Sequence, residues 1–395
     1  MLFSPRSRLA GSLGLSFLLF GFASYPVERG IFSAPAFYQK QAERPFHTHS
    51  FRLPVEPTLD RQKPLALTEY GGWIFTHDTW IGAINDQWIG AFSERGFDKA
   101  LWMIPNAGGL TTEPVGVEKW VFFSFRNGSV AKVNAESGTI AWTTTLDTYV
   151  NRPMIQAQNK WIVSTATGNL YALDIQSGKV EWLLNVGSPH DITLRGLAAP
   201  ICFEDHLYIG SAEGEIVAIR AETGSLLWKK NPFVTPQTGQ RQFVDILGEM
   251  LLLKGKELLF TRNDGFVGTL HVDTQTVHPW ISIEKGVHAT TSQFRDNRYY
   301  VGSLEGKISA FDVDTQKLVW ETELGYVPAS LTVGEQYAYV IGTDGKVTSL
   351  HLQGGAIHWV ENLEGSLAAS PIYVPTHHSF YVASPAGYLY GYLIQ

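Results

Sequence analysis

The sequence predicts an all-β protein built from a repeated unit of strands. Of its 395 residues, 38 are glycine, 13% are aromatic and only 17% are charged, a composition that favours strands joined by many tight turns. Tryptophans recur with steps of 40, 40, 46, 52, 40 and 39 residues, at positions 102, 142, 182, 228, 280, 320 and 359. Periods near 40 residues indicate a propeller or a solenoid, and the contents of these repeats indicate strands.

One repeat, WIVSTATGNLYALDIQSGKVEW (161–182), shows the unit most clearly. Its opening apolar run predicts a strand, and the turn that ends at Gly168 supplies the positive φ of a tight hairpin. A second strand follows, then a turn of the type Asp-x-x-Ser/Thr-Gly, and then the tryptophan strand. A further strand, often opened by proline, precedes each unit. Four strands per repeat are typical of a propeller blade.

The number of repeats predicts the number of blades. A hairpin glycine stands fourteen or fifteen residues before six of the tryptophans, Trp88 takes its place before Trp102, and Gly387 marks a last repeat. Eight units of ~40 residues account for residues 65–395. We therefore predict an eight-bladed β-propeller. The last repeat stops after its third strand, Tyr388–Ile394, so we expect residues near 65–76 to supply its outermost strand and close the ring.

The N-terminal region predicts export. Arg6 and Arg8 precede an apolar run that ends at Ala23, the pattern of a secretory signal peptide over residues 1–23. No charge lies between Arg8 and Glu28, so an uncleaved membrane anchor is the alternative. Residues 24–64 contain six prolines and predict an extended linker. The cleavage site has no cysteine that could carry a lipid, since Cys202 is the only cysteine.

The composition also excludes several classes of function. With 30 Lys+Arg against 37 Asp+Glu, the chain has a net charge of −7 and no basic block, which argues against a nucleic-acid-binding protein. One cysteine allows neither an intramolecular disulfide nor a cysteine zinc cluster.

Residues that could suggest a catalytic, cofactor or metal site have simpler structural interpretations. We expect the repeated tryptophans to fill the interfaces between blades rather than to stack on a cofactor. Asp174, Asp312 and Asp314 are expected to cap turns, and Asn127-Gly-Ser129 is expected to form a hairpin turn. We expect His47, His49, His377 and His378 to lie on the surface, and Cys202 to be a small buried core residue. The sequence therefore predicts no catalytic residue, cofactor or metal ion.

Two departures from the regular repeat predict a binding surface. From each tryptophan to the next hairpin glycine the usual distance is 25 to 28 residues, but it is 32 after Trp182 and 37 after Trp228. The insertions lie in segments 187–200 and 231–248, at equivalent places in consecutive blades, so we expect them to emerge as neighbours on one face. They contain arginines set among apolar side chains, which are frequent interface hot spots. A tolerated surface insertion is the alternative.

The repeat G-x-x-x-A-x-D-x-x-T/S-G-x-x-x-W resembles the quinoprotein-like (PQQ-type) propeller repeat. The segment Thr193-Leu194-Arg195-Gly196-x-x-Ala199-Pro200 resembles the BamB family of outer-membrane assembly factors. This resemblance implies a non-enzymatic periplasmic scaffold without a cofactor. It also implies a monomer that docks on the periplasmic domains of BamA beside other assembly-machine subunits, and is thereby held peripherally at the outer membrane.

The resemblance also implies contact residues. The family's Leu-x-Leu-Arg-Gly loop corresponds to Ile192, Leu194, Arg195 and Gly196. Its acidic loop, one blade further on, corresponds to the segment that contains Arg241, Phe243 and Asp245; Phe243 stands where the family usually has an aspartate. The missing lipid-bearing cysteine is a second departure from the family.

Two other functions share the repeat. A quinone-dependent dehydrogenase is usually longer and has a disulfide between adjacent cysteines, which one cysteine cannot form. A different extracytoplasmic scaffold or sensor propeller, tied to the inner membrane through residues 9–27, is the other alternative.

Overall fold

The computed structural model describes residues 46–52, 72–84, 87–93, 99–187, 199–211, 214–232, 245–262, 266–282, 287–362, 372–374, 379–384 and 388–394. The chain divides into two units, Met1–Gly30 and Ile31–Gln395, and all of the described residues lie in the second unit. Within the described residues, no helix has the length and apolar character needed to cross a membrane.

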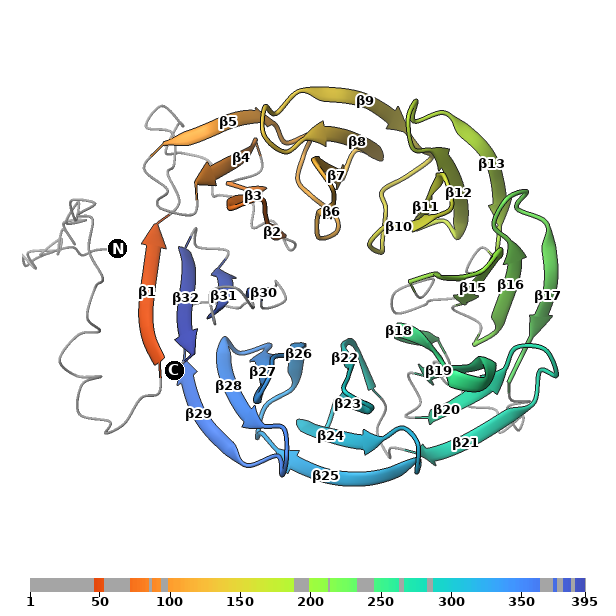
Figure 1. Cartoon of the computed structure of the whole chain (residues 1–395), viewed down its shortest axis with the longest axis vertical. Coiled ribbons are helices and arrows are strands. Elements are labelled where there is room, and N and C mark those ends of the chain that lie inside the picture. Colours follow the sequence, from red (N-terminus) through yellow and green to blue (C-terminus); the bar gives the residue numbers. More distant parts are fainter. Residues whose placement is uncertain are drawn as a thin grey trace, which may run out of the picture. The chain divides into compact units, whose positions relative to one another are not determined.

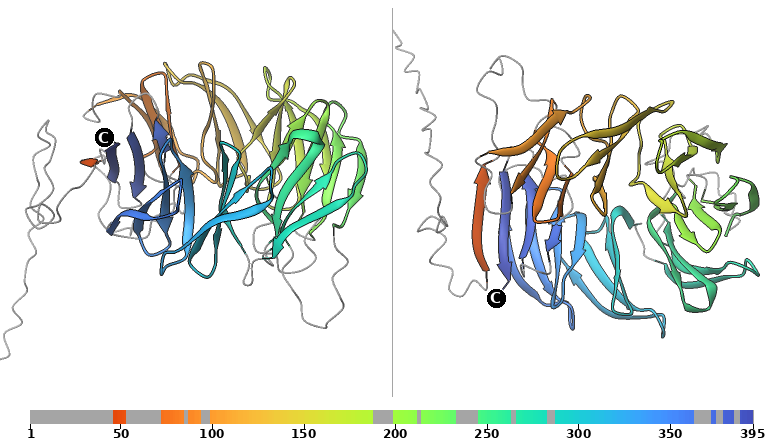
Figure 2. Two further views of the ribbon diagram at one scale, coloured as in Figure 1. Left: turned by 60° about the horizontal axis from the view of Figure 1, so that its bottom comes forward. Right: turned by 45° about the horizontal axis from the view of Figure 1, so that its top comes forward.

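The second unit is a ring of antiparallel sheets (Figure 1). The described residues form eight four-stranded sheets, which we number as blades 1 to 8 in chain order, and the strands of each blade run between the two faces of the ring (Figure 2). In blades 1 to 7 the four strands follow one another along the chain, from the innermost to the outermost. This arrangement confirms the predicted eight-bladed propeller.

The strand bounds are as follows. Blade 1 has β2 (Trp73–Thr76), β3 (Thr79–Ala83), β4 (Trp88–Ser93) and β5 (Ala100–Pro105), and blade 2 has β6 (Val115–Val117), β7 (Trp120–Ser124), β8 (Ser129–Asn134) and β9 (Ile140–Thr145). Blade 3 has β10 (Ile155–Ala157), β11 (Lys160–Ser164), β12 (Asn169–Asp174) and β13 (Val180–Asn185), and blade 4 has β14 (Ile201–Phe203), β15 (His206–Gly210), β16 (Ile216–Arg220) and β17 (Leu226–Lys230).

The second half of the ring continues the pattern. Blade 5 has β18 (Ile246–Leu253), β19 (Glu257–Arg262), β20 (Phe266–His271) and β21 (Val277–Ser282), with the short 3₁₀ helix η2 (Lys254–Lys256) between β18 and β19. Blade 6 has β22 (Val287–Arg295), β23 (Arg298–Ser303), β24 (Lys307–Asp312) and β25 (Lys317–Glu323), and blade 7 has β26 (Pro328–Val333), β27 (Tyr337–Gly342), β28 (Lys346–His351) and β29 (Ile357–Asn362). Blade 8 has β30 (Ile372–Val374), β31 (Ser379–Ser384), β32 (Tyr388–Ile394) and β1 (Phe46–Arg52).

The sequence pattern of each strand follows from its place in the blade. The second and third strands, such as β11 and β12, have uninterrupted apolar runs at their centres because both of their faces are buried against neighbouring blades. The outermost strands of blades 1 and 3, β5 and β13, alternate instead, because one face packs inward while the other faces water.

The hydrophobic core is divided among the junctions between blades. Eight clusters of buried side chains occur among the described residues, one at each junction, including the junction of blade 8 with blade 1. Each blade is therefore stabilised by both neighbours, and the ring is held by apolar contacts all the way round.

The repeated tryptophans fill these junctions, as predicted. Trp102, Trp142, Trp182 and Trp320 each donate from Nε1 to a backbone carbonyl of the next blade, over 2.8 to 3.1 Å. Each of these tryptophan rings packs against a glycine in the second turn of the next blade. A Cβ on Gly178, for example, would lie 2.5 Å from the Trp142 ring, closer than real Cβ contacts allow. These glycines also have φ near +70°, so both turn geometry and ring contact select glycine.

The predicted turn chemistry is confirmed for Asp174, Asp312 and Asn127, whereas Asp314 Oδ2 accepts a hydrogen bond from the Asn297 side chain at 2.9 Å. Asp174 Oδ1 accepts hydrogen bonds from the backbone N and Oγ of Ser177, and Asp312 Oδ1 accepts from the backbone N and Oγ1 of Thr315. Asn127 Oδ1 accepts from Ser129 in the same way inside a hairpin turn.

Other sequence predictions have mixed outcomes. Cys202 is only half-buried, against the junction of blades 3 and 4, and burial raises the pKa of its thiol. His47 and His49 lie on β1, whereas His377 and His378 fall outside the described residues.

The predicted closing strand was wrong. Residues 46–52 form β1, which pairs with β32 as the outermost strand of blade 8, whereas residues 73–76 form β2, the innermost strand of blade 1. A two-residue turn at His77 and Asp78, both with positive φ, joins β2 and β3 as a hairpin, so β2 belongs to blade 1. The proline-free stretch between Pro45 and Pro54 is long enough for a strand, so the segment predicted as an extended linker contributes to the ring.

Candidate docking face

Of the seven predicted contact residues, the structure describes Asp245. The other six lie outside the described residues; they are Ile192, Leu194, Arg195, Gly196, Arg241 and Phe243.

The described strand ends show where the two insertions begin and end. The first insertion joins the end of β13 to the start of β14, and the second joins the end of β17 to the start of β18. Because neighbouring strands in a blade are antiparallel, the end of an outermost strand and the start of the next innermost strand lie at the same face. Both insertions therefore leave and re-enter the ring at one face, on the consecutive blades 3, 4 and 5 (Figure 1).

A chain of polar side chains supports the start of the first insertion. Asp147, between β9 and β10, accepts hydrogen bonds from Asn169 Nδ2 at 2.8 Å, from Tyr171 Oη at 3.0 Å and from Thr167 Oγ1. Burial raises the pKa of Asp147, but the hydrogen bonds from Thr167, Asn169 and Tyr171 outweigh it and hold that pKa below its ordinary value. The carboxylate therefore remains charged at neutral pH.

The same series of hydrogen-bonded side chains extends to the start of the first insertion. Asn185 Nδ2 donates to Asn169 Oδ1 at 2.7 Å, and the backbone N of Gly187 donates to Asn185 Oδ1 at 3.1 Å. Gly187 immediately precedes the first undescribed residue of the insertion. Blades 2 and 3 thus jointly fix the point from which this insertion departs.

The end of the second insertion is anchored by burial. Asp245 is only 2% exposed, and the next residue, Ile246, donates its backbone N–H to Ser211 O of blade 4 at 3.2 Å. Ile246 pairs with Arg262, which is only 4% exposed, so two opposite charges are buried at neighbouring register positions. Sequence reasoning missed this burial, although Asp245 directly precedes an apolar strand that leads into the core.

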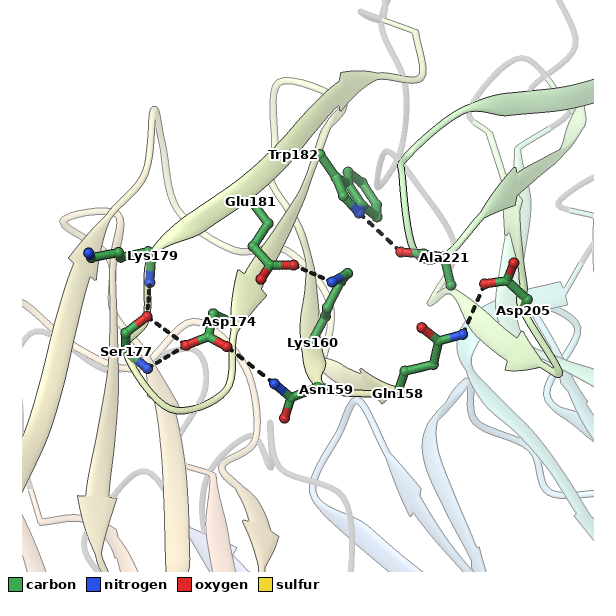
Figure 3. Close-up of polar contacts among 10 residues, drawn as sticks. All are labelled: Gln158, Asn159, Lys160, Asp174, Ser177, Lys179, Glu181, Trp182, Asp205 and Ala221. Carbon is green, nitrogen blue, oxygen red and sulfur yellow. Dashed lines mark hydrogen bonds and ion pairs between the residues drawn. The ribbon is translucent and has the colours of Figure 1, made fainter.

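Polar contacts at the opposite face fix blades 3 and 4 to one another (Figure 3). Gln158 Nε2 donates to Asp205 Oδ1 at 2.9 Å, and Trp182 Nε1 donates to Ala221 O at 3.0 Å. Lys160 and Glu181 form an ion pair within blade 3. The two hydrogen bonds hold the blades that flank the first insertion in a fixed relative orientation.

The described residues contain no group of three or more His, Cys, Asp or Glu side chains that could hold a metal ion. At the face where both insertions begin and end, the described strand ends of blades 3, 4 and 5 form a frame held by hydrogen bonds and burial. Insertions on one face of a repeat protein are commonly its binding surface.

The sequence is similar to outer membrane protein assembly factors and, over a shorter stretch, to a dehydrogenase. It is 23% identical over 274 residues to the outer membrane protein assembly factor BamB of Yersinia pestis; the match covers 68% of this chain and 56% of that protein, so it spans little more than half the relative's length. A shorter match, 26% identical over 136 residues, covers 32% of this chain and 19% of a 1-butanol dehydrogenase (cytochrome c) of Thauera butanivorans.

The fold is shared with solved structures. The crystal structure of BamB from Moraxella catarrhalis matches 87% of this chain and 98% of that one, with a TM-score of 0.70 and 20% identity. The family model described as "Outer membrane protein assembly factor BamB" matches residues 85–301 and 280–395, which is well over half of the chain. On that match, the chain belongs to the BamB family of outer membrane protein assembly factors.

Proposed function

We propose that this protein is a non-enzymatic periplasmic scaffold of the β-barrel assembly machinery, peripheral to the outer membrane, that docks on the periplasmic domains of BamA. The observation that carries the proposal is the pair of insertions on consecutive blades, which leave one face of a rigid frame in a chain of the BamB family. A ring of this kind holds the beginnings and ends of both insertions in fixed relative positions, which reduces the part of the ordering cost of binding that comes from the frame.

The residues divide into contacts and supports. Leu194 and Arg195, with Ile192 and Gly196, form the first contact loop, and Arg241 and Phe243 belong to the second. The burial of Asp245 supports a positioning role, in which its carboxylate fixes the end of the second insertion from inside the protein.

Two observations favour a scaffold over a quinone-dependent enzyme. Asp174 and Asp312, the carboxylates most suggestive of a calcium loop, are engaged in turn hydrogen bonds. The dehydrogenase relative matches only about a third of this chain, 32%, whereas the BamB family model matches well over half of it.

The decisive experiment is co-purification with native partners from the envelope. Arg195→Glu should weaken docking by about 2 kcal/mol or more, roughly thirtyfold, because it places a repulsive charge at a hot-spot position. The matched control is Lys179→Glu, the same charge reversal on an exposed residue of blade 3 at the opposite face.

Loss of the BamA complex from Arg195→Glu but not from Lys179→Glu supports the proposal. If the wild-type protein retains no BamA, the scaffold proposal fails. If both variants retain it equally, the first insertion is not the contact.

A further inference from the structure

We propose that β1 is a releasable strand, and that the edge of β32 beneath it is an acceptor site for an extended, uncharged strand of another polypeptide. The proposal goes beyond docking on BamA and does not depend on the two insertions.

The first argument is connectivity. In blades 1 to 7 the outermost strand directly follows its neighbour along the chain; β13, for example, follows β12 through the turn between Asp174 and Val180. β1 and β32 come from opposite ends of the ring's sequence, and no turn joins them. The register from Phe46↔Ile394 to Arg52↔Tyr388 is the pairing that holds β1 in its blade.

The second argument is the missing tryptophan. On blade 7, Trp359 pairs with Ser349, which pairs with Tyr339, the third residue of β27. On blade 8, the corresponding third residue of β31 is Tyr381, which pairs with Gly391, and Gly391 pairs with His49. Histidine therefore occupies the register position that tryptophan holds in blades 1 to 4, 6 and 7. In blade 5 that position is His278, but Trp280 follows two residues later in the same strand, whereas β1 contains no tryptophan. β1 lacks the residue that anchors the other outermost strands.

The third argument is that the ring stays closed without β1. Blade 8 is held through its other strands: Tyr392 and Phe380 stack at 4.5 Å in the cluster shared with blade 7, and Tyr381 packs edge-on against Trp80 of blade 1 at 4.4 Å between ring centroids. Releasing β1 therefore uncovers one strand edge without opening the propeller. Residues 53–72 span at most ~66 Å when extended, enough for β1 to leave while remaining attached.

The composition of the two strands indicates the occupant. β32 reads YLYGYLI, with no charged residue, whereas β1 reads FHTHSFR, with an arginine and two histidines. Aromatic and β-branched residues pair best across antiparallel strands, so an uncharged strand that alternates such residues fits the β32 edge better than β1 does. Attachment gives β1 a local concentration on the order of millimolar, so a competitor must bind well to displace it.

The test uses a fluorescent peptide with the sequence of residues 46–52 in which valine replaces both histidines and threonine replaces the arginine, so that its side chains carry no charge. A variant with Cys202→Ser, His47→Cys and Leu393→Cys places a disulfide across facing positions of β1 and β32. The variant His49→Pro weakens β1, because proline removes a ladder hydrogen bond. Binding is measured by fluorescence anisotropy to the wild-type chain, to His49→Pro and to the cysteine variant, oxidised and reduced.

We expect His49→Pro to bind the peptide at least tenfold more tightly than the wild-type chain, and the oxidised variant to bind it only after reduction. A control peptide with proline at its central position should not bind. Equal binding to the oxidised and reduced forms, no binding to His49→Pro, or failure of the disulfide to form would each overturn the proposal. Arg195→Glu leaves this binding unchanged, so failure of the docking proposal is distinguishable.

Discussion

The second turn of each blade shows how a single residue sets the fit between neighbouring blades. In four blades this turn has glycine, at Gly138, Gly178, Gly224 and Gly355, with a tryptophan ring resting on it. In blade 6 the position is Gln316, which keeps a positive φ of 58°. The facing tryptophan, Trp280, has a buried Nε1 without a hydrogen-bond partner among the described residues. At this position a residue with a Cβ therefore occupies the left-handed turn on which the other rings rest, and Trp280 also lies at a bulge in β21.

Replacing that residue should therefore stabilise the protein. A left-handed conformation costs a non-glycine residue roughly 1–2 kcal/mol, so Gln316→Gly should raise the free energy of unfolding by about 1 kcal/mol and the melting temperature by about 2–4 °C. Gln176→Gly is the control, because Gln176 lies in the equivalent turn of blade 3 outside the positive-φ region, and there glycine should slightly destabilise. A lower melting temperature for Gln316→Gly would refute this account of the turn.

Asp147 gives a pH-dependent prediction at the same scale. Its pKa is below the ordinary value of 3.8, so its hydrogen bonds contribute stability that is complete at neutral pH and is lost as the pH falls below 3.8 and through the folded-state pKa. Asp147→Ala should therefore destabilise at pH 7, by less than about 1 kcal/mol because the carboxylate is exposed to solvent. The difference from wild type, measured by urea unfolding, should shrink towards the acid limit. A difference that is constant with pH would contradict the assignment.

Residue-scale roles were predictable where they depend on local pattern. Asp174 and Ser177 lie three residues apart in a repeated turn, so their hydrogen bonds follow from the sequence. The burial of Asp245 depends on its nearness to Arg262, seventeen positions later in the chain, and no local pattern contains that information.

At the scale of the strand, each outermost tryptophan strand joins two blades through one side chain. Trp182 fills its junction and also donates to Ala221 O at 3.0 Å, whereas Trp280 fills an equivalent junction without such a bond among the described residues. A comparison of the two junctions therefore tests how much the hydrogen bond adds to ring packing, although Trp182 pairs in register with Ala172 and Trp280 lies at a bulge.

Phenylalanine preserves much of the apolar contact and removes the indole N–H. Trp182→Phe should lower the free energy of unfolding by about 1 kcal/mol more than Trp280→Phe does, because only the first substitution leaves a carbonyl without its donor. Denaturant unfolding of both variants measures the difference. Equal losses would show that ring packing alone holds the junctions.

Strands with a repeated pattern were predictable, and the closing strand was not. The spacing of glycine and tryptophan identifies blades 1 to 7 because each of their strands pairs with its neighbour in sequence. β1 pairs with β32, more than 300 residues away, and its polar sequence between two prolines has no signal for that partner. Non-local pairing is decided by which strand edge is left open, a property of the assembled ring.

At the scale of the whole molecule, the packing that stabilises the ring can be separated from the insertions that we propose as contacts. The eight junction clusters hold the ring, and they consist of blade residues and the connections packed against them. The second insertion lengthens the distance from Trp228 to the next hairpin glycine to 37 residues, against at most 28 in the regular blades.

Removing nine residues from 233–244 restores the regular spacing of 28 while keeping Asp245 and the strand that follows it. We expect the shortened protein to melt within about 2 °C of wild type, because loop closure changes by only a few tenths of a kcal/mol for such a difference in length. If the proposed docking is correct, co-purification with the BamA complex should be strongly reduced, because one of the two proposed contact loops is missing. Thermal unfolding and co-purification from the envelope measure the two effects on the same preparation. A large loss of stability would mean that the insertion belongs to the frame, and undiminished co-purification would restrict the docking site to the first insertion.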